Sequence, residues 1–181
     1  MAALARDGNV LGALSLVVAD QMSDAVAAAA DQSMTAAAAL SALEHFADGC
    51  SVDRLRRILG LTSSGTVRLV DRLVAAGDVR RREGPDARTT SIALTAAGRR
   101  AARRVTAARG DVLEDALSGL SPAERRDLEH LAARVLDGVV RQKLAREAQS
   151  TRWICRLCDL GACGRDEGRC PAATTARAAS A

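Results

Sequence analysis

Four of the five cysteines in this chain of 181 residues lie close together near its C-terminal end. They are Cys155, Cys158, Cys163 and Cys170, which gives the pattern C-x2-C-x4-C-x6-C. Four thiolates can close a tetrahedral zinc site, of which C-x2-C is the usual half. The same four can hold a [4Fe–4S] cluster, and a final Cys-Pro also occurs in bacterial ferredoxins. We expect zinc as the cofactor, with the iron–sulfur cluster as the alternative.

Two other interpretations of these cysteines stay open. The thiols could form a thiol–disulfide switch, or they could have no specific role. Arginines at positions 152, 156, 165 and 169 surround them and would stabilise thiolates. The N-terminal residues lack the pattern of a signal peptide, so we expect a cytoplasmic chain, where metal or redox chemistry is commoner than structural disulfides. A metal centre here would either sense metal or oxidant, or act as a structural staple.

A second chemically distinctive group consists of Ser64, Arg68 and Arg72. Their spacing of four residues places them on one face of a helix predicted over residues 63–75. Such a face suits the major groove of DNA, where a guanidinium group can bind guanine or phosphate with two hydrogen bonds. Residues 51–100 have a net charge of +6, whereas the whole chain has +4, as expected of a phosphate-contacting surface. The alternative is an ordinary amphipathic helix with a solvated arginine face.

Two short helices must hold this face in place. Ser51 and Thr62 are suitable N-cap residues for helices predicted over 52–59 and 63–75, and Gly60 allows the tight turn between them. We expect Leu55, Ile58 and Leu59 on the core side of the first helix. On the core side of the second helix we expect Val67, Val70, Leu73 and Val74. The sequence therefore predicts a helix-turn-helix.

A basic β-hairpin is predicted directly after these helices. Its strands cover residues 78–83 and 89–94, and Gly84-Pro85-Asp86 is the turn signal between them. Arg81 lies in the first strand and Arg88 near the tip, and both are candidate DNA contacts. A hairpin behind a helix-turn-helix is a wing, which can place an arginine in the adjacent minor groove.

Longer helices are predicted on both sides of this unit, over residues 9–30, 35–47, 96–117 and 122–148. The last begins at a capping box, Ser121-Pro122-Ala123-Glu124. Apolar stripes run along the first and the last helix: Val10, Leu14, Val17 and Val18; and Leu128, Leu131, Val135, Leu136, Val139 and Leu144. A domain this small cannot cover both stripes, so we expect a homodimer. The fold class is mostly α: a winged helix-turn-helix with long N- and C-terminal dimerisation helices and a small two-stranded wing.

The composition excludes several other classes of protein. The chain has one Phe, one Trp and no Tyr, which argues against nucleic-acid binding by aromatic stacking. The uncharged stretches are too short or too rich in alanine to predict a membrane span. His45 and His130 are isolated, and Cys50 is expected to be a buried structural thiol. No catalytic residues are predicted, and residues 171–181 are expected to be disordered.

Two short motifs identify a resemblance. Asp86-Ala87-Arg88-Thr89 fits D-x-R-[S/T], and Leu94-Thr95-Ala96-Ala97-Gly98 fits L-T-x-x-G. Together with the segments 61–64 and 66–73 and with Gly77, they make the chain similar to the MarR family of regulators over about residues 36–147. The resemblance implies a dimer of two winged lobes that represses a neighbouring gene and is released by a small ligand or an oxidant. It also places the DNA contacts at Ser63, Ser64, Thr66, Arg68 and Arg72 in the major groove and at Arg88 in the minor groove.

The chain departs from the family pattern in three places. Asp78 stands where members commonly have an apolar residue, the first helix is acidic and rich in alanine, and aromatic residues for a phenolic ligand pocket are scarce. The cysteine pattern also lies outside the family pattern. We therefore divide the chain into an N-terminal dimerisation helix (1–34), a DNA-binding domain (35–98), C-terminal dimerisation helices (99–150) and a Cys-rich segment with a disordered end (151–181).

The sequence thus predicts a DNA-binding transcriptional regulator. It would be a repressor that acts as a homodimer on double-stranded DNA, away from the membrane, and responds to a small molecule, a metal or an oxidant. One alternative is a winged-helix module that binds proteins instead of DNA. The other is a metal- or redox-active enzyme, against which a closed four-cysteine site argues because it leaves no open position for a substrate.

Overall fold

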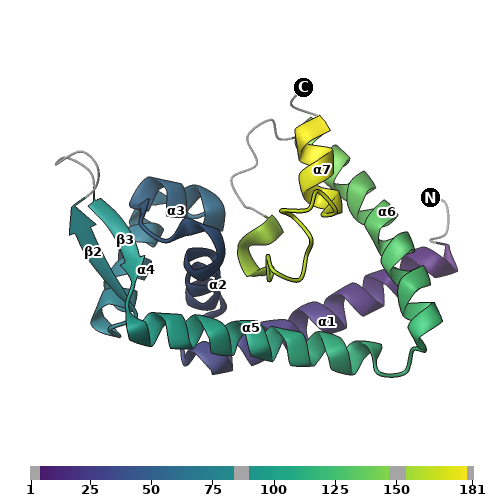
Figure 1. Cartoon of the computed structure of the whole chain (residues 1–181), viewed down its shortest axis with the longest axis horizontal. Coiled ribbons are helices and arrows are strands. Elements are labelled where there is room, and N and C mark those ends of the chain that lie inside the picture. The colour runs from purple at the N-terminus through teal and green to yellow at the C-terminus, as the bar shows by residue number, and fades with distance from the viewer. Residues whose placement is uncertain (1–4, 84–89, 147–153, 179–181) are drawn as a thin grey trace.

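The computed structural model describes residues 5–83, 90–146 and 154–178, and these form a largely helical chain with a small antiparallel sheet at one end (Figure 1). The α-helices are α1 (Arg6–Ala30), α2 (Met34–Ala42), α3 (Val52–Leu59), α4 (Ser63–Ala75), α5 (Ala96–Leu117), α6 (Pro122–Arg146) and α7 (Pro171–Ala178). The strands are β1 (Cys50–Ser51), β2 (Val79–Glu83) and β3 (Thr90–Leu94). A π-helical segment, η1 (Leu43–Ala47), and a 3-10 turn, η2 (Ile154–Leu157), complete the elements. The predicted winged helix-turn-helix is confirmed.

Three predicted helix starts in the winged domain are made by the expected caps. The hydroxyl groups of Ser51, Thr62 and Thr95 accept hydrogen bonds from the backbone N–H three residues ahead, at 3.2, 3.1 and 3.0 Å. At the start of α6, the Glu124 carboxylate accepts from the Ser121 N–H at 2.8 Å, which closes the capping box. Local sequence therefore fixed these four boundaries.

The sheet has one strand more than the predicted hairpin. The strand order is β1-β3-β2, all antiparallel, and Cys50 in β1 pairs with Ile92 in β3. Strand β1 has only two residues, so no alternation of apolar and polar side chains could predict it. Its effect is to attach the start of α3 to the wing strands, which fixes the helix-turn-helix against the sheet.

The core side of α4 was only half predicted. Val70 and Leu73 are buried as expected, but Val67 and Val74 are 46% and 37% exposed. Leu69 and Thr66 take their places in the core. The helix is thus rotated from the predicted orientation, and its buried positions 66, 69, 70 and 73 follow helical spacing.

Two segments differ from their predicted local structure. The helix expected over 35–47 changes to a π-helical segment at Leu43, which ends at the tight turn at Gly49 (φ +74°). The prediction of disorder from residue 171 was wrong for residues 171–178, which form α7. Pro171 suits the first position of a helix, and Ala172 and Thr175 are buried, with the Thr175 hydroxyl donating to Asp137 on α6 at 2.5 Å.

The unusual Asp78 lies at the start of β2 and is only 8% exposed. Its Oδ2 accepts a hydrogen bond of 2.6 Å from Gln32 Nε2, in the turn between α1 and α2. Burial raises the pKa of this carboxyl, against the effect of Gln32. An aspartate is tolerated at this buried position because its carboxylate accepts a hydrogen bond from Gln32.

The carboxylate of Asp48 attaches strand β3 of the wing to the end of η1, and this attachment depends on pH. Burial opposes ionisation of Asp48, but hydrogen bonds from the Leu94 N–H (2.9 Å) and from Arg99 (2.5 Å) outweigh it, so the pKa of Asp48 lies below 3.8. A carboxyl whose pKa is lower in the folded chain stabilises the fold above its unfolded pKa, and this stabilisation is lost as the pH falls through the folded pKa. We expect Asp48→Asn to reduce stability at pH 7 and to flatten the loss of stability below pH 4, measured by urea unfolding over pH 2–7. An unchanged pH profile would contradict this role.

The long helices expose much apolar surface. In α1, five large apolar side chains are 48–68% exposed: Val10, Leu11, Leu14, Leu16 and Val17. In α6, the exposed large apolar side chains are Leu128, Leu131, Val135 and Val139. By length and composition alone α1 could also cross a membrane, since an 18-residue window has a mean hydropathy of 1.4 and is only 6% buried. This property differs from the expectation that the uncharged stretches are too short or too rich in alanine for a membrane span. In Figure 1, α1 lies along α5, and α6 turns away from α5.

Candidate functional site

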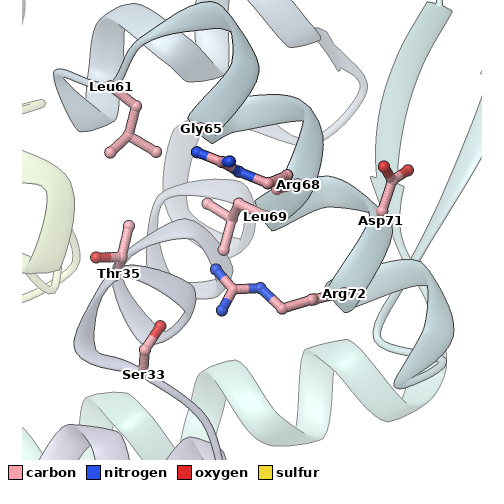
Figure 2. Close-up of a pocket in the computed structure, with 8 residues that line it drawn as sticks. All are labelled: Ser33, Thr35, Leu61, Gly65, Arg68, Leu69, Asp71 and Arg72. Atoms are coloured by element: carbon pink, nitrogen blue, oxygen red, sulfur yellow. The ribbon is translucent and has the colours of Figure 1, made fainter.

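The outer face of α4 has two arginines without partners. Arg68 and Arg72 are exposed, and neither guanidinium group has a hydrogen bond or an ion pair with another residue of the described part of the chain. Figure 2 shows both guanidinium groups reaching in one direction, on either side of Leu69, while Asp71 points away from them. Ser63 and Ser64 are exposed at the start of the same helix. This face therefore presents two free cations and two hydroxyl groups to solvent.

The two arginines border a cavity of about 630 Å³. Its other side is the start of α2, where Ser33 and Thr35 face Arg72 (Figure 2). No sequence pattern predicted this neighbourhood, because Thr35 and Arg72 are far apart along the chain. This cavity leaves the guanidinium groups of Arg68 and Arg72 room to turn toward a ligand on the open side of α4.

Arg81 connects β2 of the wing to α4. Its Nη2 lies 2.6 Å from Asp71 Oδ1, and both side chains are about half exposed. An exposed ion pair of this kind contributes at most about 1 kcal/mol to stability. The pair fixes the orientation of β2 relative to α4, and it leaves Arg81 less free for phosphate than Arg68 or Arg72.

Thr66 is a correction to the predicted contacts. Its side chain is fully buried, and its hydroxyl donates to the Thr62 carbonyl at 2.9 Å, so it has no surface to offer to DNA. The family resemblance placed it among the contacts, but in this chain α4 turns Thr66 inward together with Leu69. Arg88 lies outside the described residues, and its role at the wing tip stays a prediction.

The cysteines are brought together near α2 and α6 by η2 and α7 (Figure 1). The Cys158 N–H donates to the Cys155 carbonyl at 3.0 Å, so both thiols lie on one turn. Arg165 Nη1 lies 3.3 Å from Cys155 Sγ. Cys163 and Cys170 pack with Val140 of α6, and Cys170 is buried. All four are free thiols.

The four thiols differ in acidity. A hydrogen bond from the Cys158 thiol, together with the charge and hydrogen bond of Arg165, lowers the pKa of Cys155 to about 6 in spite of burial. The same hydrogen bond and burial raise the pKa of Cys158. Burial also raises the pKa of Cys163 and of Cys50, which is a buried thiol in β1. Cys155 is thus the member of the group with the strongest thiolate character.

The fit of these thiols to a metal ion can be judged from their arrangement. Among the described residues, which include all four cysteines, no group of three or more His, Cys, Asp and Glu side chains is placed to hold a metal ion. The thiols lie as two neighbouring pairs, Cys155 with Cys158 and Cys163 with Cys170. Zinc and the iron–sulfur cluster stay predictions.

Comparison with known proteins identifies the domain that carries the arginine face. Residues 32–89, which hold both helices of the helix-turn-helix, match the model of the MarR family. The chain carries a MarR-family domain. No curated protein matches the chain.

Solved structures extend the likeness beyond the matched MarR-family domain. RV1404 from Mycobacterium tuberculosis is 28% identical, with a TM-score of 0.62 over 75% of this chain and 95% of that one. A probable transcriptional regulator from Pseudomonas aeruginosa is 26% identical, with a TM-score of 0.53 over 68% and 95%. MepR, a transcription regulator of the Staphylococcus aureus multidrug efflux pump MepA, shares the fold at 18% identity, with a TM-score of 0.64 over 75% and 99%. These shares exceed the matched segment 32–89, so the likeness of fold extends beyond it.

Proposed function

We propose that this MarR-family protein is a transcriptional repressor that binds double-stranded DNA as a homodimer, with α4 in the major groove. The observation that carries the proposal is the pair of exposed guanidinium groups of Arg68 and Arg72 on the second helix of a helix-turn-helix, which have no partner among the described residues. In this motif the second helix is the one that enters the groove. The likeness to a probable transcriptional regulator supports the same conclusion.

The exposed apolar side chains support the dimer. The stripes on α1 and α6 are too large to stay in water on a monomer, since contiguous apolar patches of this kind mark interaction surfaces. A second copy of the chain fits better than lipid, because α1 carries Asp20 and Asp24, whose charges would be costly in a bilayer. Two α4 helices related by a two-fold axis would then face two half-sites of one operator.

A charge placed in the α6 stripe should prevent dimer formation. In Leu131→Glu, two carboxylates would have to enter an apolar interface without partners, so we expect the variant to elute as a monomer where the wild-type chain elutes as a dimer. Size-exclusion chromatography with light scattering measures this directly. Arg126→Glu, on the same helix but away from the stripe, is the matched control and should stay dimeric. A dimeric Leu131→Glu variant would show that the interface lies elsewhere.

Selection from a library of random DNA duplexes tests the function without knowledge of the operator. We expect the full-length chain to enrich a sequence with two inverted half-sites whose centres are about one helical turn, roughly 10 base pairs, apart or a multiple of this. Placed between a promoter and a reporter, the enriched site should lower expression when the protein is produced. If no sequence is enriched, DNA recognition is excluded and the protein-binding alternative gains support.

A further inference from the structure

The turn η2 places two thiols and one guanidinium group together in a way that the DNA-binding function does not use. Cys155 and Cys158 lie on a single turn, closed by the 3.0 Å hydrogen bond from the Cys158 N–H to the Cys155 carbonyl. Arg165 donates to Cys155 Sγ at 3.3 Å. Both thiols are half-buried, so a small molecule can reach them, and neither is in a disulfide.

The other cysteine pair provides a comparison within the same segment. Cys163 Sγ donates to the Leu160 carbonyl at 3.6 Å, and Cys170 is buried against α6 and α7. Arg165 Nη1 donates to Cys155 Sγ, whereas Cys163 Sγ lies against a backbone carbonyl. A nearby cation and access to solvent are the conditions that make a cysteine reactive toward oxidants. Cys155 meets both conditions.

We propose that Cys155 and Cys158 form a dithiol site that is oxidised by hydroperoxides to an intramolecular disulfide. The Cys155 thiolate attacks one peroxide oxygen, the O–O bond breaks, and the leaving alkoxide or hydroxide takes up a proton. Cys155 is then a sulfenic acid. Cys158 Sγ attacks the sulfur of Cys155, the S–O bond breaks, and water leaves with the proton of the Cys158 thiol. Two thiols are thus oxidised while one hydroperoxide is reduced to an alcohol, or to water, and a further water.

The roles of the two thiols follow from their surroundings. Arg165 holds a positive charge beside Cys155, which is the thiolate that the first step needs. Cys158 lies on the same turn and is placed to resolve the sulfenic acid. Two residues between the cysteines is the spacing of thiol–disulfide motifs in reducing compartments.

The position of η2 connects this chemistry to the winged domain. Leu157 of η2 packs against the domain's core, and η2 contacts α2. A cavity of about 480 Å³ between the segment and the domain is lined by Arg165 and Leu160 on one side and by His45 and Arg54 on the other. A disulfide would change the geometry of η2 and draw Cys155 from Arg165. We expect this change to alter DNA affinity, a consequence that rests on the proposed function.

Peptide mapping of the full-length chain tests the site. After treatment of the reduced chain with hydrogen peroxide, we expect the intact mass to fall by two hydrogens. Trypsin cleaves after Arg156, between the two cysteines, so only a disulfide keeps the two resulting peptides together. Cys158→Ser should stop at the sulfenic acid of Cys155, which dimedone labels. Arg165→Gln should slow the reaction by about tenfold or more, because the thiolate loses its cation.

Three results would overturn the dithiol site. The first is oxidation of Cys155→Ser as fast as the wild-type chain, and the second is a disulfide that joins Cys163 to Cys170 instead. The third is about one zinc, or a brown iron–sulfur chromophore, in anaerobically purified chain that is lost in Cys155→Ser, which would show that the thiols are metal ligands. Cys50→Ser is the matched control and should oxidise like the wild-type chain.

A DNA titration separates this inference from the proposed function. The reduced chain and the oxidised chain are titrated with the selected duplex, and we expect affinities that differ by at least about tenfold, a typical coupling between two sites. If the reduced chain binds no duplex, the proposed function fails, while the peptide map still decides the dithiol site. If both forms bind equally, the link between the thiols and DNA is wrong.

Discussion

Gly98→Ala lowers the free energy of unfolding by about 3 kcal/mol or more, because the new methyl group collides with the backbone. A Cβ at position 98 would lie 2.0 Å from the Asp78 carbonyl oxygen and 3.0 Å from Leu94 Cδ2. The carbonyl cannot move aside without cost, since it accepts the Thr95 N–H at 2.9 Å and the Thr95 hydroxyl at 3.2 Å. Relief of the collision would therefore break the cap of α5 and separate that helix from the wing.

Urea unfolding monitored by circular dichroism measures this loss. Gly110→Ala in the same helix is the matched control, because a Cβ there meets nothing within 4 Å. That variant should be as stable as the wild-type chain or gain up to about 1 kcal/mol from helix propensity. A Gly98→Ala variant that unfolds at the wild-type urea concentration would mean that α5 does not approach β2 this closely.

The same glycine shows what the sequence could and could not supply. The motif L-T-x-x-G indicated a family resemblance, and Thr95 was recognisable as a cap from local rules alone. The reason for the glycine is the Asp78 carbonyl, twenty residues earlier, which no local rule connects to it. Caps, helix lengths and the turn at Gly60 were predictable because each depends on a few neighbouring residues. The strand β1 and the rotation of α4 depend on tertiary packing.

The residues of the candidate sites were likewise predictable where local sequence sets their position, and were not predictable where tertiary packing sets it. Arg68 and Arg72 were predictable because helical periodicity alone sets their common face. Thr66 was misplaced because it was carried over from the family pattern, whereas its side chain is fully buried in this chain. For the cysteines, spacing identified the group but not its arrangement in pairs, which comes from the turn at η2 and from packing on α6. Helix α7 was missed because its buried face, Ala172 and Thr175, is too short and too polar to give an apolar pattern.

Arg68→Ala and Arg72→Ala should each weaken binding to the selected duplex by about 10- to 100-fold, the usual value of a guanidinium group with two hydrogen bonds to a base. Both side chains are exposed and lack partners in the described part of the chain, so their removal should leave the fold and its urea midpoint unchanged. Fluorescence anisotropy with a labelled duplex measures the affinity. Arg126→Ala, which removes the same charge from α6, is the matched control and should bind like the wild-type chain.

The salt dependence of the same titrations distinguishes base recognition from phosphate contact. An arginine that neutralises a phosphate should, when removed, lower the slope of log affinity against log salt by about one, and weaken all sequences equally. An arginine that binds a guanine should relax the sequence preference at one position of each half-site and leave the slope nearly unchanged. Two variants with wild-type affinity, slope and preference would show that α4 is not the DNA-reading helix, because no contact of any kind would then depend on its two free cations.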